Sequence, residues 1–466
     1  VDPDVAERVR VLRDWRHDYP RAFVGLLQAT LASPQAAVAA AGAGLSALHR
    51  ELVVSRDGAS WPLSELERVP VAALPELVAV GGHGAHPGRL AVPYDGEELT
   101  GDALLRQVDD WVDDGVVEPG CGEALRAVVA SPDWLDLRDV EVVVLGAGAE
   151  MAPTELLLAW GARVTAVDVP KAEVWSRLLA QAEVGTGRLS LPVRPGAAPA
   201  GPLAERAGVD LLTNLPELLA LFEPRARGLL LGTYLYADGG RHVLVNAAAD
   251  ALAVRLLAAG AAGVATLATP TDAFAVPEDT VAASRRALAR AGHLPALTRR
   301  VTGGRLLAPA YPRLVERGDG RRVGLLDAYV VQQGPNYALA KAVQRWRAAV
   351  TRAAGVRASL TVAPMTLTRS VLQRRLLATG YGGTAHFDVE VFEPETSRAL
   401  TAALLVHDLR ARSAAAHPGT PLAHPEELPA ATAAHGGLWR LAYAPRTVLP
   451  LAVLAGVPAQ VRSALP

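Results

Sequence analysis

The chain has 466 residues, of which 50% are hydrophobic and 20% charged, and its formal net charge at pH 7 is −2. This composition is typical of a globular protein with a large core, and the near-neutral charge predicts neither a nucleic acid nor a membrane as partner. A single cysteine, Cys121, excludes an internal disulfide, and the charged opening VDPDVAERVRVLRDW lacks the apolar stretch of a signal peptide. We therefore expect a cytoplasmic protein.

Residues 1–138 are expected to be mainly helical. Apolar residues recur at i, i+3 and i+4 in four stretches: 4–15, 20–32, 33–52 and 100–117. Ser33 before Pro34 indicates a helix N-cap with proline at the first helical position, and Thr100 indicates a second cap. The glycine- and proline-rich segment 81–96 is expected to be a loop.

From residue 140 the pattern changes to that of a β-α-β unit, with strands at 140–145 and 163–169 around a helix at 152–162. Further buried strands are expected at 209–214, 227–236, 263–269, 322–330 and 356–364. Helical stretches separate most of them, at 242–260, 278–292 and 336–355, and one more follows at 394–415. The alternation predicts an α/β fold with a Rossmann-type, doubly wound parallel sheet.

Two glycines, Gly146 and Gly148, stand where the first strand of this unit turns into the helix. Glycine at such a turn lets backbone N–H groups approach a pyrophosphate at the positive end of the helix. Met151 replaces the third glycine of the G-x-G-x-x-G pattern, and we count Glu150 and Met151 with the turn as cofactor-binding residues. The turn therefore predicts a bound nucleotide.

Asp168 closes the second strand, about 20 residues after the glycines, where an acid accepts ribose hydroxyls and repels a 2′-phosphate. NAD(H) is therefore favoured over NADP(H), although Lys171 leaves NADP(H) open. The same pattern fits an S-adenosylmethionine-dependent methyltransferase, or a simple tight turn without a ligand.

Lys171 and Lys341 are the only lysines in a chain whose other basic residues are arginines. Tyr337 precedes Lys341 by four residues, so on a helix the two lie on one face about 6 Å apart. A nearby ammonium group lowers the pKa of a phenol, which allows proton transfer to or from an alcohol near neutral pH. The pair therefore predicts an acid/base site.

The context of this pair resembles the short-chain dehydrogenase/reductase superfamily. The helix with Tyr337 and Lys341 leads through a glycine into the strand at 356–364, and then to a loop rich in threonine that contains a proline. The resemblance covers residues 139–400. It implies an NAD(P)-binding Rossmann fold, Tyr337 as general acid/base, and Lys341 as the residue that lowers its pKa and holds the nicotinamide ribose.

The resemblance also implies roles for residues before this helix. Segment 209–214 corresponds to the fourth strand of that fold, which ends near the adenine ribose at Asn214. Asn246 corresponds to the residue that holds a proton-relay water. Thr269, or Thr271 if the register slips, corresponds to the residue that binds the substrate oxygen.

The chain departs from the superfamily pattern in two places. Glu150 and Ala152 stand where the superfamily prefers glycine. Residues 275–335 form an insertion before the active-site helix, which could cap a substrate pocket. The insertion also offers Gln332 and Gln333 as alternative hydrogen-bond donors to the substrate.

We expect a mainly helical region at 1–138, an NAD(P)-binding domain at 139–400 and a C-terminal extension at 401–466. The expected function is an NAD(P)-dependent oxidoreductase acting on a small-molecule carbonyl or alcohol, with a homodimer as the usual assembly. The alternatives are the methyltransferase and a non-catalytic Rossmann-like scaffold. His83 and His86 lack the spacing of a closed zinc site, so no metal is expected.

Overall fold

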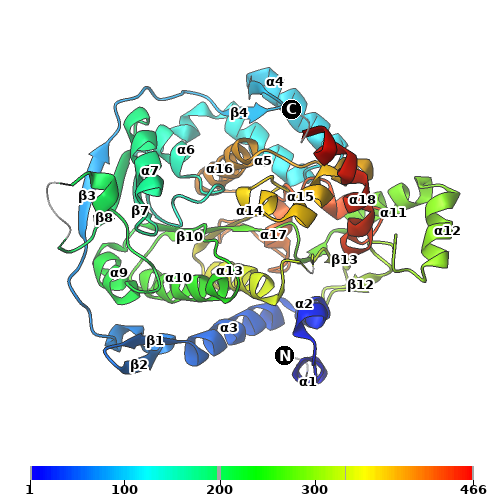
Figure 1. Ribbon diagram of the computed structural model, residues 1–466, viewed down its shortest axis with the longest axis horizontal. Helices are drawn as coiled ribbons and strands as arrows, with labels where there is room; N and C mark the ends of the chain where they lie inside the picture. The colour runs from blue at the N-terminus through cyan, green and yellow to red at the C-terminus, as the bar shows by residue number, and fades with distance from the viewer. Residues whose placement is uncertain (1–2, 197–200, 331, 464–466) are drawn as a thin grey trace.

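The computed structural model describes residues 3–196, 201–330 and 332–463, and it has a mixed α/β fold around a seven-stranded sheet (Figure 1). The strand order is β14-β10-β9-β6-β7-β8-β3. The strands are β3 (Glu76–Gly81), β6 (Glu141–Leu145), β7 (Arg163–Val167), β8 (Arg188–Val193), β9 (Leu230–Thr233), β10 (Gly263–Ala268) and β14 (Arg357–Val362). All neighbours run parallel except β3, which pairs antiparallel with β8.

Helices cover both faces of this sheet (Figure 1). One face carries α9 (Leu215–Phe222), α10 (Gly240–Ala258) and α13 (Pro335–Ala353), and the other carries α5 (Pro119–Ala130), α6 (Thr154–Ala159), α7 (Ala172–Val184) and α16 (Pro394–Arg410). Successive residues of a strand point to opposite faces. Val143 and Leu145 of β6 therefore join the first core, whereas Val142 and Val144 join the second. This explains the unbroken apolar run of that strand.

Residues 1–138 contribute to the main sheet as well as packing beside it. Their elements are α1 (Pro3–Arg10), α2 (Trp15–Thr30), α3 (Pro34–Glu51), η1 (Leu63–Arg68), α4 (Gly101–Asp113), η2 (Pro132–Leu135), β3, α5 and the hairpins β1 (Val53–Arg56)/β2 (Ala59–Pro62) and β4 (Ala91–Tyr94)/β5 (Glu97–Thr100). Ser33 caps α3, because its hydroxyl accepts the Ala36 N–H at 3.0 Å. Thr100 precedes α4, but its side chain makes no capping bond. The segment expected as a loop contains β4.

Five of the expected strands are confirmed in the main sheet, as β6, β7, β9, β10 and β14. The strand expected at 209–214 is wrong: the backbone there forms turns that lead into α9, with Asn214 at its N-cap. Val209 donates its N–H to the Asp168 carbonyl at 3.0 Å, just beyond the end of β7, and residues 211–213 then form a turn into α9 instead of continuing as a strand. The fourth parallel strand is β9 instead.

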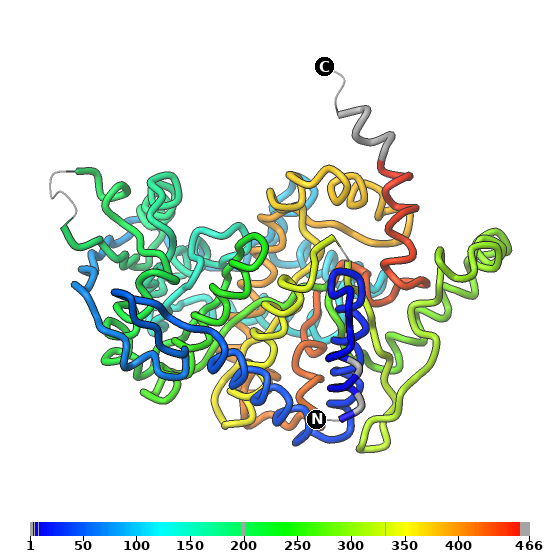
Figure 2. The backbone as a smooth tube through the Cα atoms, turned by 60° about the horizontal axis from the view of Figure 1, so that its bottom comes forward, coloured from blue at the N-terminus to red at the C-terminus, as the bar shows by residue number. Residues whose placement is uncertain are grey.

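The expected insertion at 275–335 contains β13 (Arg322–Asp327), which lies outside the main sheet. It forms a second, antiparallel sheet in the order β11-β13-β12, with β11 (Ala273–Val276) and β12 (Leu314–Glu316). The helices α11 (Glu278–Arg290) and α12 (His293–Val301) extend from it to the edge of the molecule, as Figure 2 shows.

The remaining elements are short or lie toward the C-terminus. They are α8 (Leu203–Arg206), η3 (Glu223–Arg225), α14 (Arg369–Leu372), α15 (Arg375–Gly382), η4 (Thr384–Phe387), α17 (Glu427–Ala431), η5 (Leu438–Arg440) and α18 (Pro445–Ser463). Helix α15 packs against α18. Among the described helices, none has the length and apolarity needed to cross a bilayer.

Candidate functional site

A cavity of about 960 Å³ lies at the carboxyl ends of the parallel strands. Residues that follow β6, β7, β9, β10 and β14 line it, together with α13 and the segment that contains α14. The chain leaves β6 toward β7 on one side and returns to β9 on the other. Ligands of open α/β sheets bind at such a reversal of strand order.

The two glycines of the first turn are required by their surroundings. Gly146 has a φ of +77°, and a Cβ on it would lie 2.9 Å from the carbonyl oxygen of Tyr234. A Cβ on Gly148 would lie 2.4 Å from Cγ1 of Val174 on α7. Both glycines line the cavity, so the backbone forms part of its wall without side chains.

The turn does not lead directly into a helix, contrary to expectation. Residues 146–153 form turns and α6 begins only at Thr154, whose hydroxyl donates to the Ala147 carbonyl at 2.8 Å. Glu150 and Met151 line the cavity within this stretch. The Glu150 carboxylate accepts the backbone N–H of Arg369 at 2.8 Å, which ties the turn to α14. Residues 149–153 therefore separate the glycines from α6 along the chain, although the Thr154 bond keeps the start of α6 beside the turn.

Asp168 lies at the end of β7 and faces the same turn. Its Oδ2 accepts the Gly148 N–H at 2.7 Å and its Oδ1 accepts the Val169 N–H at 2.8 Å. Burial raises the pKa of Asp168, while these two hydrogen bonds act against the rise. Lys171 lies on the same wall. A half-buried carboxylate beside a glycine turn can accept further hydrogen bonds from ligand hydroxyls.

Three of the residues expected in acid/base catalysis line this cavity together: Thr269, Tyr337 and Lys341. Tyr337 and Lys341 lie one turn apart in α13, which begins after Gly334 at a φ of +82°. Burial raises the pKa of Tyr337, and a hydrogen bond with Thr269 opposes the rise. The Thr271 hydroxyl lies 2.9 Å from that of Thr269 but does not line the cavity.

Two protein groups hold the ammonium group of Lys341. Its Nζ donates to the Leu267 carbonyl at 3.1 Å and to Oε1 of Gln344 at 3.0 Å. Burial lowers the pKa of Lys341 to about 8, and the negative charge of Asp272 acts in the opposite direction. An ammonium group has three donors, so these two contacts leave one for a bound molecule.

Two asparagines expected in the site lie outside the cavity wall. Asn214 stands at the N-cap position of α9 without a side-chain capping bond, and it does not line the cavity. Asn246 is buried, and its amide groups are used by protein neighbours: Oδ1 accepts from Nε2 of Gln344 at 2.7 Å, and Nδ2 donates to the His242 carbonyl at 2.8 Å. Asn246 therefore supports Lys341 indirectly, through Gln344. Gln344 is a residue of this site that the sequence did not indicate.

His242 is a second residue that sequence reasoning missed. It lies on α10, four residues before Asn246, and lines the cavity beside Tyr337. Its position four residues before Asn246, on the same face of the helix, was the signal in the sequence that could have identified it. Gln332 and Gln333 line the cavity as well, and the side-chain oxygen of each is buried without a partner among the described residues. The end of the insertion thus reaches the cavity, whereas α11 and α12 do not line it.

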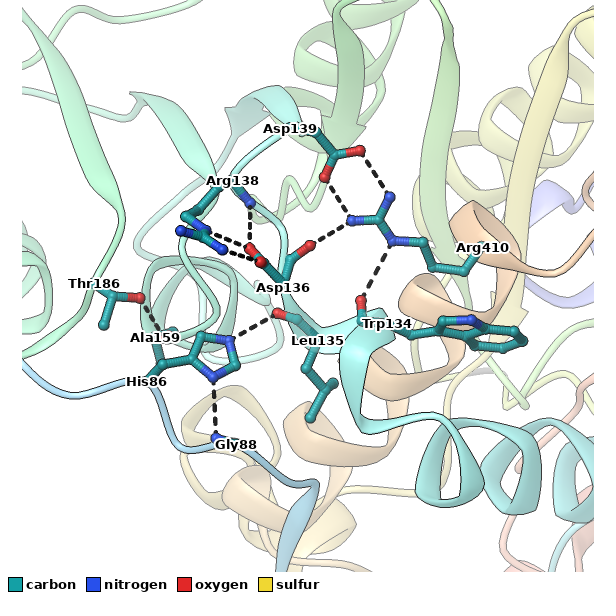
Figure 3. A network of polar contacts seen from close by, with 10 residues as sticks. All are labelled: His86, Gly88, Trp134, Leu135, Asp136, Arg138, Asp139, Ala159, Thr186 and Arg410. Atoms are coloured by element: carbon teal, nitrogen blue, oxygen red, sulfur yellow. Dashed lines mark hydrogen bonds and ion pairs between the residues drawn. The ribbon is translucent and has the colours of Figure 1, made fainter.

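His86, in the loop at 81–96, makes hydrogen bonds to the backbone around it. Nδ1 of His86 accepts the Gly88 N–H at 3.0 Å, and its Nε2 lies 3.2 Å from the Leu135 carbonyl (Figure 3). In the same network, Arg410 of α16 pairs with Asp139. Within the described ranges, no three His, Cys, Asp or Glu side chains gather as metal ligands would.

No protein-family model matches this chain, and no curated protein is significantly similar to it. The contacts around the cavity therefore carry the functional assignment.

Proposed function

We propose that this chain is an NAD(H)-dependent oxidoreductase that interconverts a carbonyl and an alcohol on a small molecule. One observation carries the proposal. A single cavity gathers the glycine turn and Asp168 with Thr269, Tyr337 and Lys341, although these residues come from distant segments. Such a cavity can hold a dinucleotide at one end and a substrate at the other.

The order of the parallel strands supports a Rossmann-type core. Numbered along the chain from β6, the strands β8-β7-β6-β9-β10-β14 have the order 3-2-1-4-5-6 of the dinucleotide-binding fold. The cavity lies where that fold binds its cofactor. This agrees with the resemblance to short-chain dehydrogenases/reductases, which remains part of the proposal.

The residues of the first turn fit an adenosine ribose. Gly146 and Gly148 leave space that a Cβ would fill, and the Asp168 carboxylate can accept ribose hydroxyls. The same carboxylate would repel a 2′-phosphate, so NAD(H) is preferred to NADP(H). When bound, the nicotinamide ring exchanges a hydride with the substrate carbon.

The chain itself would move the proton. Tyr337 acts as general acid/base at the substrate oxygen, and Thr269 polarises that oxygen by donating a hydrogen bond. Burial raises the pKa of the phenol and the Thr269 hydrogen bond lowers it. We assign to the Lys341 ammonium, one turn away on α13, the further role of favouring the phenolate. Gln344 and Asn246 hold Lys341 in place and are positioning residues rather than catalytic ones.

A second candidate is an S-adenosylmethionine-dependent methyltransferase. The start of α6 at Thr154 favours it, because turn residues 149–153 stand between the glycines and the helix N-terminus that would stabilise a pyrophosphate. S-adenosylmethionine shares the adenosine ribose that Asp168 can bind but carries no phosphate.

Thermal unfolding with NADH, NADPH and S-adenosylmethionine tests the proposal, because a ligand at 100 times its Kd stabilises by about 2.7 kcal/mol. We expect the largest rise in Tm with NADH. The matched control is Gly148→Val, whose side chain would collide with Val174 and fill the turn. A rise with S-adenosylmethionine alone would favour the methyltransferase, and no rise with any ligand would favour a scaffold.

A further inference from the structure

The hairpin of α11 and α12, residues 278–305, lies at the edge of the molecule (Figures 1 and 2). Its helix α12 carries an exposed apolar stripe. Leu294, Leu297 and Val301 have exposures of 74%, 57% and 77%. Their spacing of i, i+3 and i+7 puts them on one face of α12. In α12 no residue is buried, so the stripe does not serve the protein's own core.

The same hairpin carries an excess of positive charge. Its six arginines are Arg285, Arg286, Arg290, Arg299, Arg300 and Arg305, against two acids, Glu278 and Asp279. None of the six forms an ion pair with any described residue. Glu278 is itself paired with Arg322 at the base of the hairpin. The outer part of the hairpin is therefore cationic, although the whole chain has a net charge of −2.

We propose that the α11–α12 hairpin binds an anionic membrane surface. Apolar side chains on one helix face can enter the headgroup region, while flanking arginines bind lipid phosphates through their planar forks. The arginine stems can also lie along the apolar layer with their charged ends in the headgroups. The net charge of the whole chain does not indicate such a partner, because the positive charge of this hairpin is cancelled in that sum by acidic residues elsewhere.

The shape of the hairpin favours a lipid surface over a protein partner. A stable protein interface covers about 800 Å² on each partner, whereas the stripe consists of three side chains on a nine-residue helix. Each arginine near an anionic bilayer adds about 1 kcal/mol of attraction. The inference is independent of the proposed redox function, because the hairpin does not line the cavity.

Co-sedimentation of the full chain with phosphatidylcholine vesicles, with and without about 30 mol% phosphatidylglycerol, tests this inference. We expect binding only to the anionic vesicles and its loss at high salt, which screens exposed charges. The double variants Leu294→Asp/Leu297→Asp and Arg299→Glu/Arg300→Glu should each weaken binding roughly tenfold or more.

Two changes elsewhere on the surface are the matched controls. Val184→Asp introduces a charge at a valine that is 73% exposed on α7, and Arg227→Glu reverses an exposed arginine outside the hairpin. Both should bind anionic vesicles as the unchanged chain does. All the substituted positions are on the surface, where such changes cost little stability. The dependence of binding on salt is measured on the unchanged chain, so it does not depend on whether a variant folds.

Several results would overturn the inference. They are an absence of binding to anionic vesicles, equal binding to neutral ones, or binding that neither double variant reduces. Light scattering that detects a dimer broken by Leu294→Asp/Leu297→Asp, without vesicle binding, would assign the stripe to self-association instead.

Discussion

The imidazole ring of His242 stacks on the phenol ring of Tyr337, with centroids 5.3 Å apart and planes at 16°. Nδ1 of His242 accepts the Ala237 N–H at 3.2 Å, so the proton of the neutral ring lies on Nε2. Burial, with a smaller contribution from the charge of Lys341, lowers the pKa of His242 to about 3. Tyr337 therefore packs against a ring that carries no charge at neutral pH.

The first prediction is that His242 does not titrate between pH 5 and 8. In the unfolded chain its pKa is near 6.5, so only the unfolded state gains this proton as the pH falls toward 3. The contribution of His242 to stability therefore decreases below pH 6.5. Nitrogen-15 NMR of the imidazole checks this, and a native-state midpoint near pH 6.5 would contradict it.

The second prediction concerns the Tyr337 hydroxyl. Tyr337→Phe keeps the ring that packs on His242 but removes the acid/base group. We expect turnover to fall by roughly 10²- to 10⁴-fold, with NADH binding nearly unchanged. Steady-state kinetics and NADH fluorescence titration measure the two effects. Full activity in this variant would remove Tyr337 from the mechanism.

The third prediction is a pH dependence that comes from Lys341. Its pKa of about 8 means that the ammonium is present below that pH and is lost as the pH rises through it. NADH affinity and turnover should therefore both decrease above pH 8. Lys341→Met should bind NADH more weakly and show no such inflection. An identical inflection in Lys341→Met would assign the titration to another group.

The fourth prediction tests Asp168. Asp168→Asn keeps an oxygen for the Gly148 N–H but loses the negative charge that the ribose hydroxyls would contact. Because a hydrogen bond to a charged group is worth about 1.5–3 kcal/mol, NADH should bind roughly 10- to 100-fold more weakly. NADPH should lose less affinity, since the repulsion of its 2′-phosphate also disappears. Asp210→Asn, at another acid of the cavity wall, is the control, and an equal loss there would refute a specific role.

The fifth prediction concerns stability and the buried carboxylate of Glu118. His435 contacts it at 2.9 Å, and Arg440 donates to it at 2.8 and 2.9 Å. Burial alone would raise the pKa of Glu118, but these contacts hold it at about 2, below its ordinary 4.5. The stabilisation is complete above pH 4.5 and disappears as the pH falls toward 2.

Glu118→Gln should therefore lower the free energy of unfolding by about 3 kcal/mol or more, since it leaves Arg440 without its counter-charge. Urea denaturation at pH 7 measures this change. Glu65→Gln, in an exposed pair with Arg68, should cost less than about 1 kcal/mol. Equal costs for the two variants would show that burial adds nothing to the Glu118 contacts.

Local sequence patterns were sufficient for several parts of the structure. The β-branched run of β6, the glycines after it and Asp168 at the end of β7 form a unit that the local pattern of residues indicates. The same holds for Tyr337 and Lys341, because a helical spacing of four decides which face they share. These residues lie around one cavity, as the pattern predicted.

Long-range contacts decided what sequence reasoning missed. Segment 209–214 has the apolar character of a strand, but after the bond from Val209 to the Asp168 carbonyl the backbone turns into α9. Asn246 has the helix position expected of a residue near the substrate, yet Gln344 takes its side-chain oxygen. Neither partner lies near in sequence, so periodicity could not identify them.

The antiparallel pairing of β3 with β8 runs from Glu76 opposite Val193 to Gly81 opposite Arg188. A fragment that began at residue 139 would lose this partner and present the bare N–H and C=O groups of β8 to other chains. Such a fragment would recruit strands from its neighbours and precipitate or swap segments. Strand β3 thus protects the edge of the sheet at β8 from pairing with strands of other chains.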